Sequence, residues 1–378
     1  MGDILHALPA VTALRRAHPD WHIAWVVEPR WQALLKAGTE GTREQGSGGT
    51  REQGSEKAGN RQGAAVQQSS LIPDPGSLFP AFPLVDRLHF AAMRDWKRHA
   101  LSSKTASEIR ALRRELRAVR YEAVLDFQGA IRSAAIARAS GCIRIIGEAH
   151  PREWPAHWLF TERVVTRGAH VIEQDLELAS AVAGDALAAA EPVLPVDAEA
   201  ERWCDAQLGP ASAGSASGAP GPIALLAPGA GWGAKRWPPE RYAAVAHGLA
   251  DRGFRVLVNA GPGEEPLAEP IVAAGAATAL TATLPQLIAL TRRISLCIAG
   301  DTGPLHLASA LGRPVVGIYG PTDPSRNGPY GAPARVLRSP ESRRDHSRRS
   351  QPDPGLLAIS PEDVLRAADE LLAEECST

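Results

Sequence analysis

A turn of glycine and polar residues, Gly300 to His306, has the composition of a phosphate-binding segment. It follows a buried apolar run, Leu296 to Ala299, and it leads into a short helix. Backbone N–H groups and the helix dipole favour an anion at such a junction, with Asp301 and Thr302 beside it. The turn is predicted to hold a nucleotide diphosphate. The alternative is an ordinary strand–turn–helix connection.

Two further strand ends in the C-terminal part carry charged side chains. Lys235 follows a glycine-rich stretch, Gly229 to Gly233, and precedes a helix, which is compatible with a phosphate loop but is not a Walker A sequence. Glu264 and Glu265 follow the strand Arg255 to Asn259. A carboxylate there could accept hydrogen bonds from a ribose diol. The sequence by itself favours a simpler role, an acid that stabilises a helix dipole.

The N-terminal part offers a second group of polar residues. Asp3 begins an amphipathic helix. The predicted strand Tyr121 to Gly129 ends at a polar tip, which places Asp126, Gln128 and Arg132 at the edge of the sheet. Ligands of α/β sheets lie beyond the carboxyl ends of strands, so these side chains are candidates for binding a substrate. A capping network at the strand end is an equally good interpretation. Arg152, in a basic and aromatic loop, is a third candidate for contact with an anionic sugar.

These residues need a scaffold, and the chain alternates strands with helices along most of its length. This pattern predicts an α/β fold of two Rossmann-like, doubly wound domains. We expect an N-terminal domain at 1–192, a linker at 193–221, a second domain at 222–355 and a C-terminal helix at 356–378. The linker contains a helix near Ala198 to Gln207 and then a run of small residues.

Two features of the N-terminal domain depart from a regular α/β pattern. The helix that begins near Asp3 should follow a strand, and no strand precedes it, which favours a start codon further upstream. Residues 38–75 are a polar, low-complexity insertion in which Gly41 to Ser47 is repeated as Gly49 to Ser55. We expect this insertion to be disordered.

Composition excludes several classes of protein. Lysine and arginine number 41 against 42 acidic residues, so no net field favours nucleic acid. The four cysteines are widely separated, which indicates free thiols rather than a disulfide framework or a zinc site. No apolar run has the roughly 20 residues of a membrane span, and no signal peptide is recognisable. The expected location is the cytoplasm.

Five motifs together resemble the bacterial ADP-heptose:lipopolysaccharide heptosyltransferases of glycosyltransferase family 9, most closely heptosyltransferase I. They occur in the family's order across nearly the whole chain: Gly2-Asp3-Ile4-Leu5-His6-Ala7-Leu8-Pro9, Asp126-Phe127-Gln128-Gly129, Lys235-Arg236-Trp237-Pro238, Gly300-Asp301-Thr302-Gly303-Pro304-Leu305-His306 and Tyr319-Gly320-Pro321-Thr322-Asp323-Pro324. The resemblance implies a GT-B architecture, in which two Rossmann-like domains face a cleft.

The resemblance also implies roles for single residues. Asp3 matches the proposed general base, and Lys235 matches the lysine that meets the donor diphosphate. Asp301 matches the carboxylate that orients the heptose, and Glu265 or its neighbour Glu264 matches the acid near the ribose. The phosphate-gripping positions of the family correspond to Thr302, Gly303 and His306.

The implied reaction is an inverting transfer of heptose from ADP-heptose to the Kdo region of the lipopolysaccharide inner core. Its acceptor would be of the Kdo-lipid A type, at the inner face of the cytoplasmic membrane, where the protein could attach peripherally. Gln128, Arg132 and Arg152 are the acceptor-side candidates. No Asp-x-Asp metal motif flanked by an apolar strand is found, so the transfer is predicted to be metal-independent, and no cofactor is implied.

Three alternatives stay open at this point. The chain could be heptosyltransferase II or another core-extending member of the family. It could instead be a GT-B sugar-nucleotide epimerase, although no convincing set of extra acid and base residues is found. It could also be a truncated, inactive nucleotide-binding relic, which restoring upstream codons and comparing transfer activity would distinguish.

Overall fold

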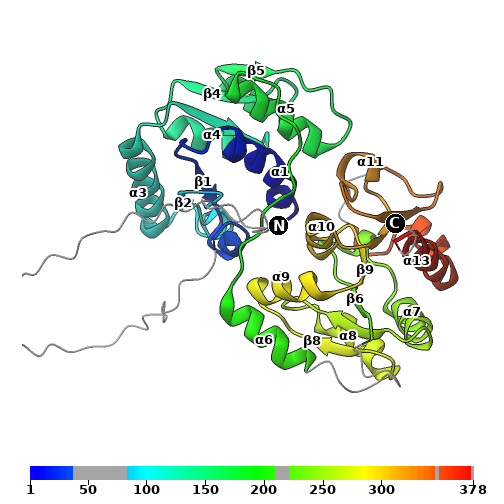
Figure 1. The fold of residues 1–378 in the computed structure, drawn as a ribbon. Coiled ribbons are helices and arrows are strands. Elements are labelled where there is room, and N and C mark those ends of the chain that lie inside the picture. Colours follow the sequence, from blue (N-terminus) through cyan, green and yellow to red (C-terminus); the bar gives the residue numbers. More distant parts are fainter. Residues whose placement is uncertain (37–82, 210–220, 345–348, 376–378) are drawn as a thin grey trace, which may run out of the picture.

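A computed structural model of the chain describes residues 1–36, 83–209, 221–344 and 349–375. These residues form two α/β halves (Figure 1). The predicted insertion at 38–75 and residues 210–220 of the predicted linker lie outside the described residues. In the described part of the chain, no helix is both long and apolar enough to cross a membrane.

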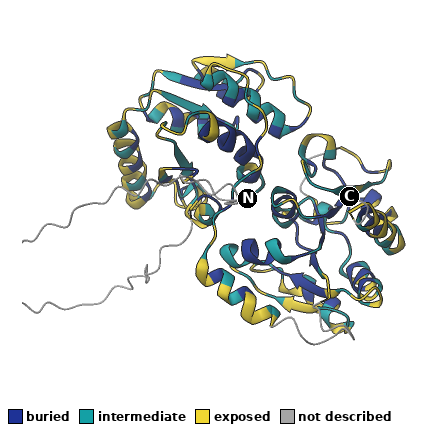
Figure 2. Ribbon diagram, in the orientation of Figure 1, coloured by how far each residue is buried: buried dark blue, intermediate teal, exposed yellow. Residues whose placement is uncertain are grey.

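The C-terminal half contains a six-stranded parallel sheet in the order β11-β10-β9-β6-β7-β8. Its strands are β6 (Ile223–Ala227), β7 (Arg255–Asn259), β8 (Thr278–Leu280), β9 (Leu296–Gly300), β10 (Val315–Tyr319) and β11 (Ala334–Arg338). Every residue of β9 and β10 is buried, as continuous apolar runs require when helices cover both faces of a sheet (Figure 2).

Alternate residues of these strands enter two separate hydrophobic clusters. Ala224 and Leu226 belong to one cluster, and Leu225 and Ala227 belong to the other. The covering elements are η3 (Gly233–Lys235), α7 (Pro239–Asp251), α8 (Glu265–Ala273), α9 (Leu284–Arg293), α10 (Gly303–Ala310), α11 (Pro324–Asn327), α12 (Pro354–Ala358) and α13 (Pro361–Glu375). The predicted C-terminal helix is α13, which packs against α7.

The N-terminal half contains two parallel sheets instead of one. The first pairs β1 (Ala24–Val27) with β2 (Arg87–Phe90), and the second orders β3 (Ala123–Asp126), β4 (Arg144–Glu148) and β5 (Glu162–Val164). None of the described strands joins these two sheets. The strand expected before Gly2 therefore stays a prediction about this half.

The helices of the N-terminal half are α1 (Gly2–Ala17), η1 (Pro29–Leu34), α2 (Met93–Arg98), α3 (Ser103–Val119), α4 (Ile131–Ala139), η2 (Trp154–Leu159) and α5 (Val171–Ala183). Helix α1 is buried from Leu5 to Arg15, between α5 and α10. Leu5 and Leu8 join the cluster that also holds Leu225 and Leu305 of the other half. One hydrophobic core thus spans both halves, and burial of each such leucine contributes roughly 1.5–3 kcal/mol.

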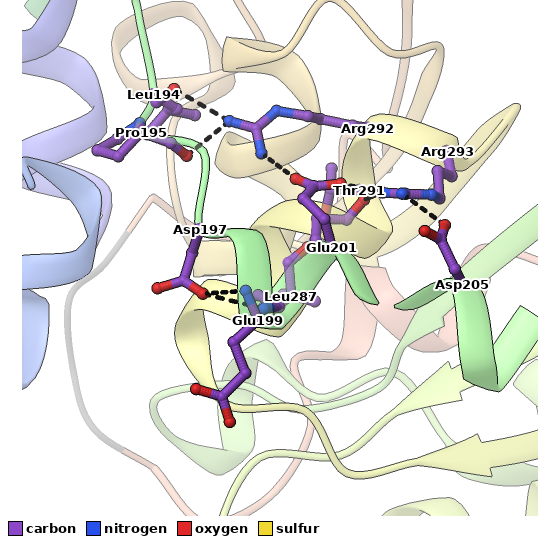
Figure 3. Close-up of polar contacts among 12 residues, drawn as sticks. Leu194, Pro195, Asp197, Glu199, Glu201, Asp205, Leu287, Thr291, Arg292 and Arg293 are labelled. Atoms are coloured by element: carbon purple, nitrogen blue, oxygen red, sulfur yellow. Dashed lines mark hydrogen bonds and ion pairs between the residues drawn. The ribbon is translucent and has the colours of Figure 1, made fainter. Parts of the chain in front are cut away.

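The helix predicted within the linker, α6 (Ala198–Leu208), belongs to the C-terminal half. It packs against α9, where Arg292 and Arg293 both bind Glu201 (Figure 3). Arg292 also donates to the carbonyl oxygens of Leu194 and Pro195 at 3.0 and 2.7 Å. The linker at 193–221 is predicted from the run of small residues that follows this helix, and its bounds stay a prediction. In the structure the chain crosses between the halves before α6 (Figure 1).

Candidate active site

The turn between β9 and α10 holds Asp301 in a buried ion pair. Its carboxylate contacts the Lys235 ammonium and accepts a hydrogen bond from His306 Nε2 at 3.0 Å. The side chains of Asp301 and Lys235 are only 8% and 11% exposed. Burial raises the pKa of Asp301, but the His306 hydrogen bond and the Lys235 charge outweigh burial and bring it well below its ordinary value. Asp301 is therefore ionised.

Lys235 is held from two sides. It ends the short helix η3 after the glycine-rich loop, and its ammonium lies 4.3 Å from the centroid of the Trp232 ring. Thr302 does not cap α10 with its side chain, since Thr302 Oγ1 donates to the Gly300 carbonyl at 3.2 Å. A cation and a helix N-terminus without a side-chain cap are thus brought together, as a diphosphate site requires.

The two neighbouring glutamates occupy different positions. Glu265 is the exposed first residue of α8, which agrees with the dipole-stabilising interpretation. Glu264 instead accepts the Gly261 N–H at 3.1 Å, and its carboxylate covers the Cα of Gly229 so closely that a methyl group there would lie 2.1 Å from Glu264 Oε2. The structure places Glu264, and not Glu265, between the carboxyl ends of β6 and β7.

Asp3 lies in the N-terminal half, in a hydrogen-bonded line with two predicted residues. Gln128 Nε2 donates to Asp3 Oδ2 at 3.0 Å, and Arg132 Nε donates to Gln128 Oε1 at 3.4 Å. The carboxylate is exposed, but protein atoms crowd it on several sides. This desolvation raises its pKa, while the Gln128 hydrogen bond and the nearby Arg152 charge lower the pKa below its ordinary value. Asp3 is therefore an ionised, accessible proton acceptor.

The neighbouring strand end has a structural function. Asp126 is buried, and its Oδ1 accepts the N–H groups of Gln128 and Gly129 at 2.8 and 3.0 Å. Asp126 thus forms the capping network and shapes the turn, and Gln128 extends from that turn to Asp3. A binding role for Gln128 stays a prediction.

The loop after β4 places aromatic surface next to Arg152. Glu153 binds this loop to the strand end: its N–H donates to the Gly129 carbonyl at 2.9 Å, and its carboxylate accepts the Ile131 N–H at 2.8 Å. Trp154 stacks on His157 with ring centroids 4.7 Å apart, yet Trp154 remains 52% exposed. A firmly held, exposed indole ring provides an apolar face beside a cation.

Sequence reasoning missed three buried residues in this region. His6 and His170, from α1 and the start of α5, lie beside His306 of α10. Asp175 is 3% exposed on α5, and burial raises its pKa well above the ordinary value, as does the nearby Asp3. The spacing of Asp175 from Ile172 and Leu178, on the apolar face of a predicted helix, is the signal that could have identified this buried acid.

The family model described as Glycosyltransferase family 9 (heptosyltransferase) matches residues 109–355, which is more than half of the chain. The chain belongs to glycosyltransferase family 9. Membership of family 9 makes it a glycosyltransferase, in agreement with the resemblance drawn from its motifs.

Relatives and a solved structure agree with this assignment to family 9. The chain is 27% identical to lipopolysaccharide heptosyltransferase 1 of Escherichia coli K12 over 357 residues, which cover 90% of this chain and 91% of the relative. It is 26% identical to lipopolysaccharide heptosyltransferase 1 of Pseudomonas aeruginosa, over 88% of this chain and 79% of that one.

The solved structure is that of E. coli heptosyltransferase WaaC with ADP. It superposes with a TM-score of 0.71 at 24% identity, covering 98% of this chain and 97% of WaaC. The predicted fold class, a GT-B-type pair of α/β halves, is confirmed.

Proposed function

We propose that the chain transfers heptose from ADP-heptose to the Kdo region of the lipopolysaccharide inner core, as a heptosyltransferase I. The names of the two relatives, which align over most of both chains, support this substrate pair. The observation that carries the proposal is the arrangement of the site. The ionised Asp3 lies one helical turn from His6, and His6 lies 3.3 Å from His306 of the diphosphate turn.

In the proposed reaction, an acceptor hydroxyl attacks the anomeric carbon of the heptose as the bond to the ADP oxygen breaks. Asp3 accepts the proton of the hydroxyl group. Its lowered pKa makes Asp3 a modest base but keeps it ionised and ready to accept that proton. Lys235 and the N-terminus of α10 stabilise the negative charge that develops on the departing ADP. A single displacement of this kind inverts the anomeric centre.

The donor-side assignments follow the same geometry. Asp301 orients the sugar and holds Lys235, and Thr302, Gly303 and His306 form the turn around the diphosphate. The acid near the ribose is Glu264, since Glu265 faces solvent at the start of α8.

The acceptor-side assignments place an anionic, membrane-anchored sugar in the N-terminal half. Gln128 and Arg132 extend from Asp3, and Arg152 lies close enough to influence the Asp3 charge. Trp154 provides an apolar surface for the C–H face of the acceptor sugar. The reaction is proposed to occur at the cytoplasmic face of the inner membrane, with the protein attached peripherally.

A donor and acceptor screen tests this function. Purified full-length protein is incubated with ADP-heptose, ADP-glucose or UDP-sugars, on Kdo-lipid A or on Kdo-lipid A that already carries one heptose. We expect product from ADP-heptose on Kdo-lipid A. Product only on the heptosylated acceptor would assign heptosyltransferase II, and turnover of a UDP-sugar in place of ADP-heptose would overturn the proposal.

A further inference from the structure

Three buried imidazoles meet between the two halves of the chain. His6 comes from α1, His170 precedes α5, and His306 lies on α10. They are 8%, 6% and 7% exposed, respectively. His6 Nε2 is 3.3 Å from His306 Nδ1, and the His6 and His170 ring centroids are 5.9 Å apart. His6 and His170 make contacts that the proposed donor and acceptor assignments do not use.

His6 is the last member of a hydrogen-bonded line that begins in the donor site. Lys235 pairs with Asp301, Asp301 accepts from His306 Nε2, and His306 Nδ1 faces His6 Nε2. Because the ionised Asp301 can only accept, His306 must donate through Nε2. One proton then lies between His306 Nδ1 and His6 Nε2, so the hydrogen-bonded line is continuous from Lys235 to α1.

Other contacts seat the beginning of α1 on the same turn. The Met1 side chain lies against Gly303, where an added methyl group would come within 2.1 Å of Met1 Cε. Gly2 faces the His306 ring in the same way, at 3.5 Å. His170 makes a second contact with the C-terminal half, because its Nε2 lies 3.0 Å from the carbonyl oxygen of Gly328.

From this arrangement we infer that His6 is a positioning residue, which couples the donor turn to α1 and so holds Asp3 at the reacting centre. The inference rests on the proposed function. Asp3 and His6 lie one turn apart on the same helix, so a shift of His6 relative to His306 moves Asp3 by a comparable amount. Misplacement of a catalytic group by about 1 Å can reduce rate about 100-fold.

Burial makes this coupling sensitive to acid. Burial lowers the pKa of His6 to about 3, with additional effects from His306 and His170, while Asp3 and Asp301 oppose the shift. These are the titratable groups that face His6 from α1, from the start of α5, from α10 and from the β9–α10 turn. The assembled contact therefore requires a neutral His6 ring. Its contribution is complete above the ordinary histidine pKa of about 6.5 and declines as the pH falls below that value.

Two variants of the full-length protein separate positioning from general stability. His6→Leu removes the hydrogen bond, and His6→Asn keeps a polar partner for His306 but cannot titrate. We expect kcat to fall about 10- to 100-fold in His6→Leu, with the Kd for ADP changed less than about threefold. His6→Asn is expected to keep most of the activity and to reduce the loss of unfolding free energy between about pH 6.5 and 5, because the unfolded chain then no longer gains a proton at this position. His18→Asn, at the other end of α1, serves as the matched control and should leave the profile unchanged.

Hydrogen exchange provides a readout that does not depend on heptose transfer. ADP should slow amide exchange in the first turns of α1 in the wild-type protein and in His6→Asn, but not in His6→Leu, even at saturating ADP. Equal protection of α1 in His6→Leu, or an unchanged pH dependence of the unfolding free energy in His6→Asn, would overturn the inference. Failure of the wild-type protein to bind ADP would instead contradict the proposed function.

Discussion

Two of the polar contacts near the junction of the halves differ in character. Where the chain crosses between the halves, Arg292 and Arg293 of α9 hold Glu201 of α6 and the carbonyl groups of Leu194 and Pro195 (Figure 3). At the candidate active site, the contact consists of the imidazoles of His6 and His306, backed by Asp301. The first contact is charged and 21–28% exposed at its central side chains, whereas both histidines are below 10% exposed.

This difference determines what each contact can do. Burial lowers the pKa of Arg293, but its hydrogen bonds to Glu201 and Asp205 outweigh burial and raise that pKa above the ordinary value, so Arg293 keeps its charge at physiological pH. The histidine contact requires a neutral His6 ring, and its contribution to stability declines as the pH falls below about 6.5. We therefore expect the crossing contact to maintain the fold and the histidine contact to respond to the state of the donor site.

The largest effect on transfer is expected at Lys235, where the hydrogen-bonded line to His6 begins. Lys235→Met removes the cation that pairs with Asp301 and that is proposed to face the departing diphosphate. We expect kcat to fall about 10²- to 10³-fold, with weaker ADP binding, because a preorganised charge in a buried site is lost. Steady-state kinetics and ADP titration measure both effects.

Lys104→Met is the matched control for this prediction, since Lys104 is 83% exposed on α3 and should tolerate the change. If Lys235→Met kept both the transfer rate and the ADP affinity of the wild-type protein, the donor-side assignment and the line of contacts leading to His6 would both be wrong.

A smaller effect on transfer is expected at the crossing contact. Glu201→Gln leaves Arg292 and Arg293 without their shared carboxylate, which should lower the free energy of unfolding by about 1–3 kcal/mol. The transfer rate per folded molecule should not change. Urea unfolding and kcat measured on the same preparations test this separation.

Glu199→Gln, on the exposed first turn of the same helix, is the control and should change stability by only a few tenths of a kcal/mol. If fully folded Glu201→Gln protein lost kcat while its unfolding free energy stayed unchanged, the stabilising role that we assign to the crossing contact would be wrong.

Local sequence pattern identified central strands of the C-terminal sheet. The predicted strand Arg255 to Asn259 matches β7 residue for residue, and the predicted apolar run Leu296 to Ala299 lies within β9. Turn residues flank these apolar runs, and burial on both faces of the sheet leaves little freedom in where such strands end. Since the carboxyl ends of parallel strands share one edge, Lys235 and Asp301 could be expected to lie together, and they do.

Long-range contacts were not predictable in this way. His6 and His306 are 300 residues apart, and neither residue has a local pattern that indicates the other. The ion pairs of Glu201 on α6 were equally hidden, because the arginines that bind it lie on α9, about 90 residues further along the chain. Glu264 and Glu265 differ only in which one faces the strand ends, a matter of backbone direction at the turn. The three-residue strands β5 and β8 are too short to show periodicity.

The central claim is that the donor is held in one half and the proton is accepted in the other. Asp3→Asn tests it most directly, because the substitution keeps the side-chain shape and the contact with Gln128 while removing the base. We predict that transfer from ADP-heptose to Kdo-lipid A falls about 10³-fold, while the Kd for ADP stays within about twofold of the wild-type value. A loss of ADP affinity as large as the loss of rate, or a transfer rate that is unchanged, would contradict the account.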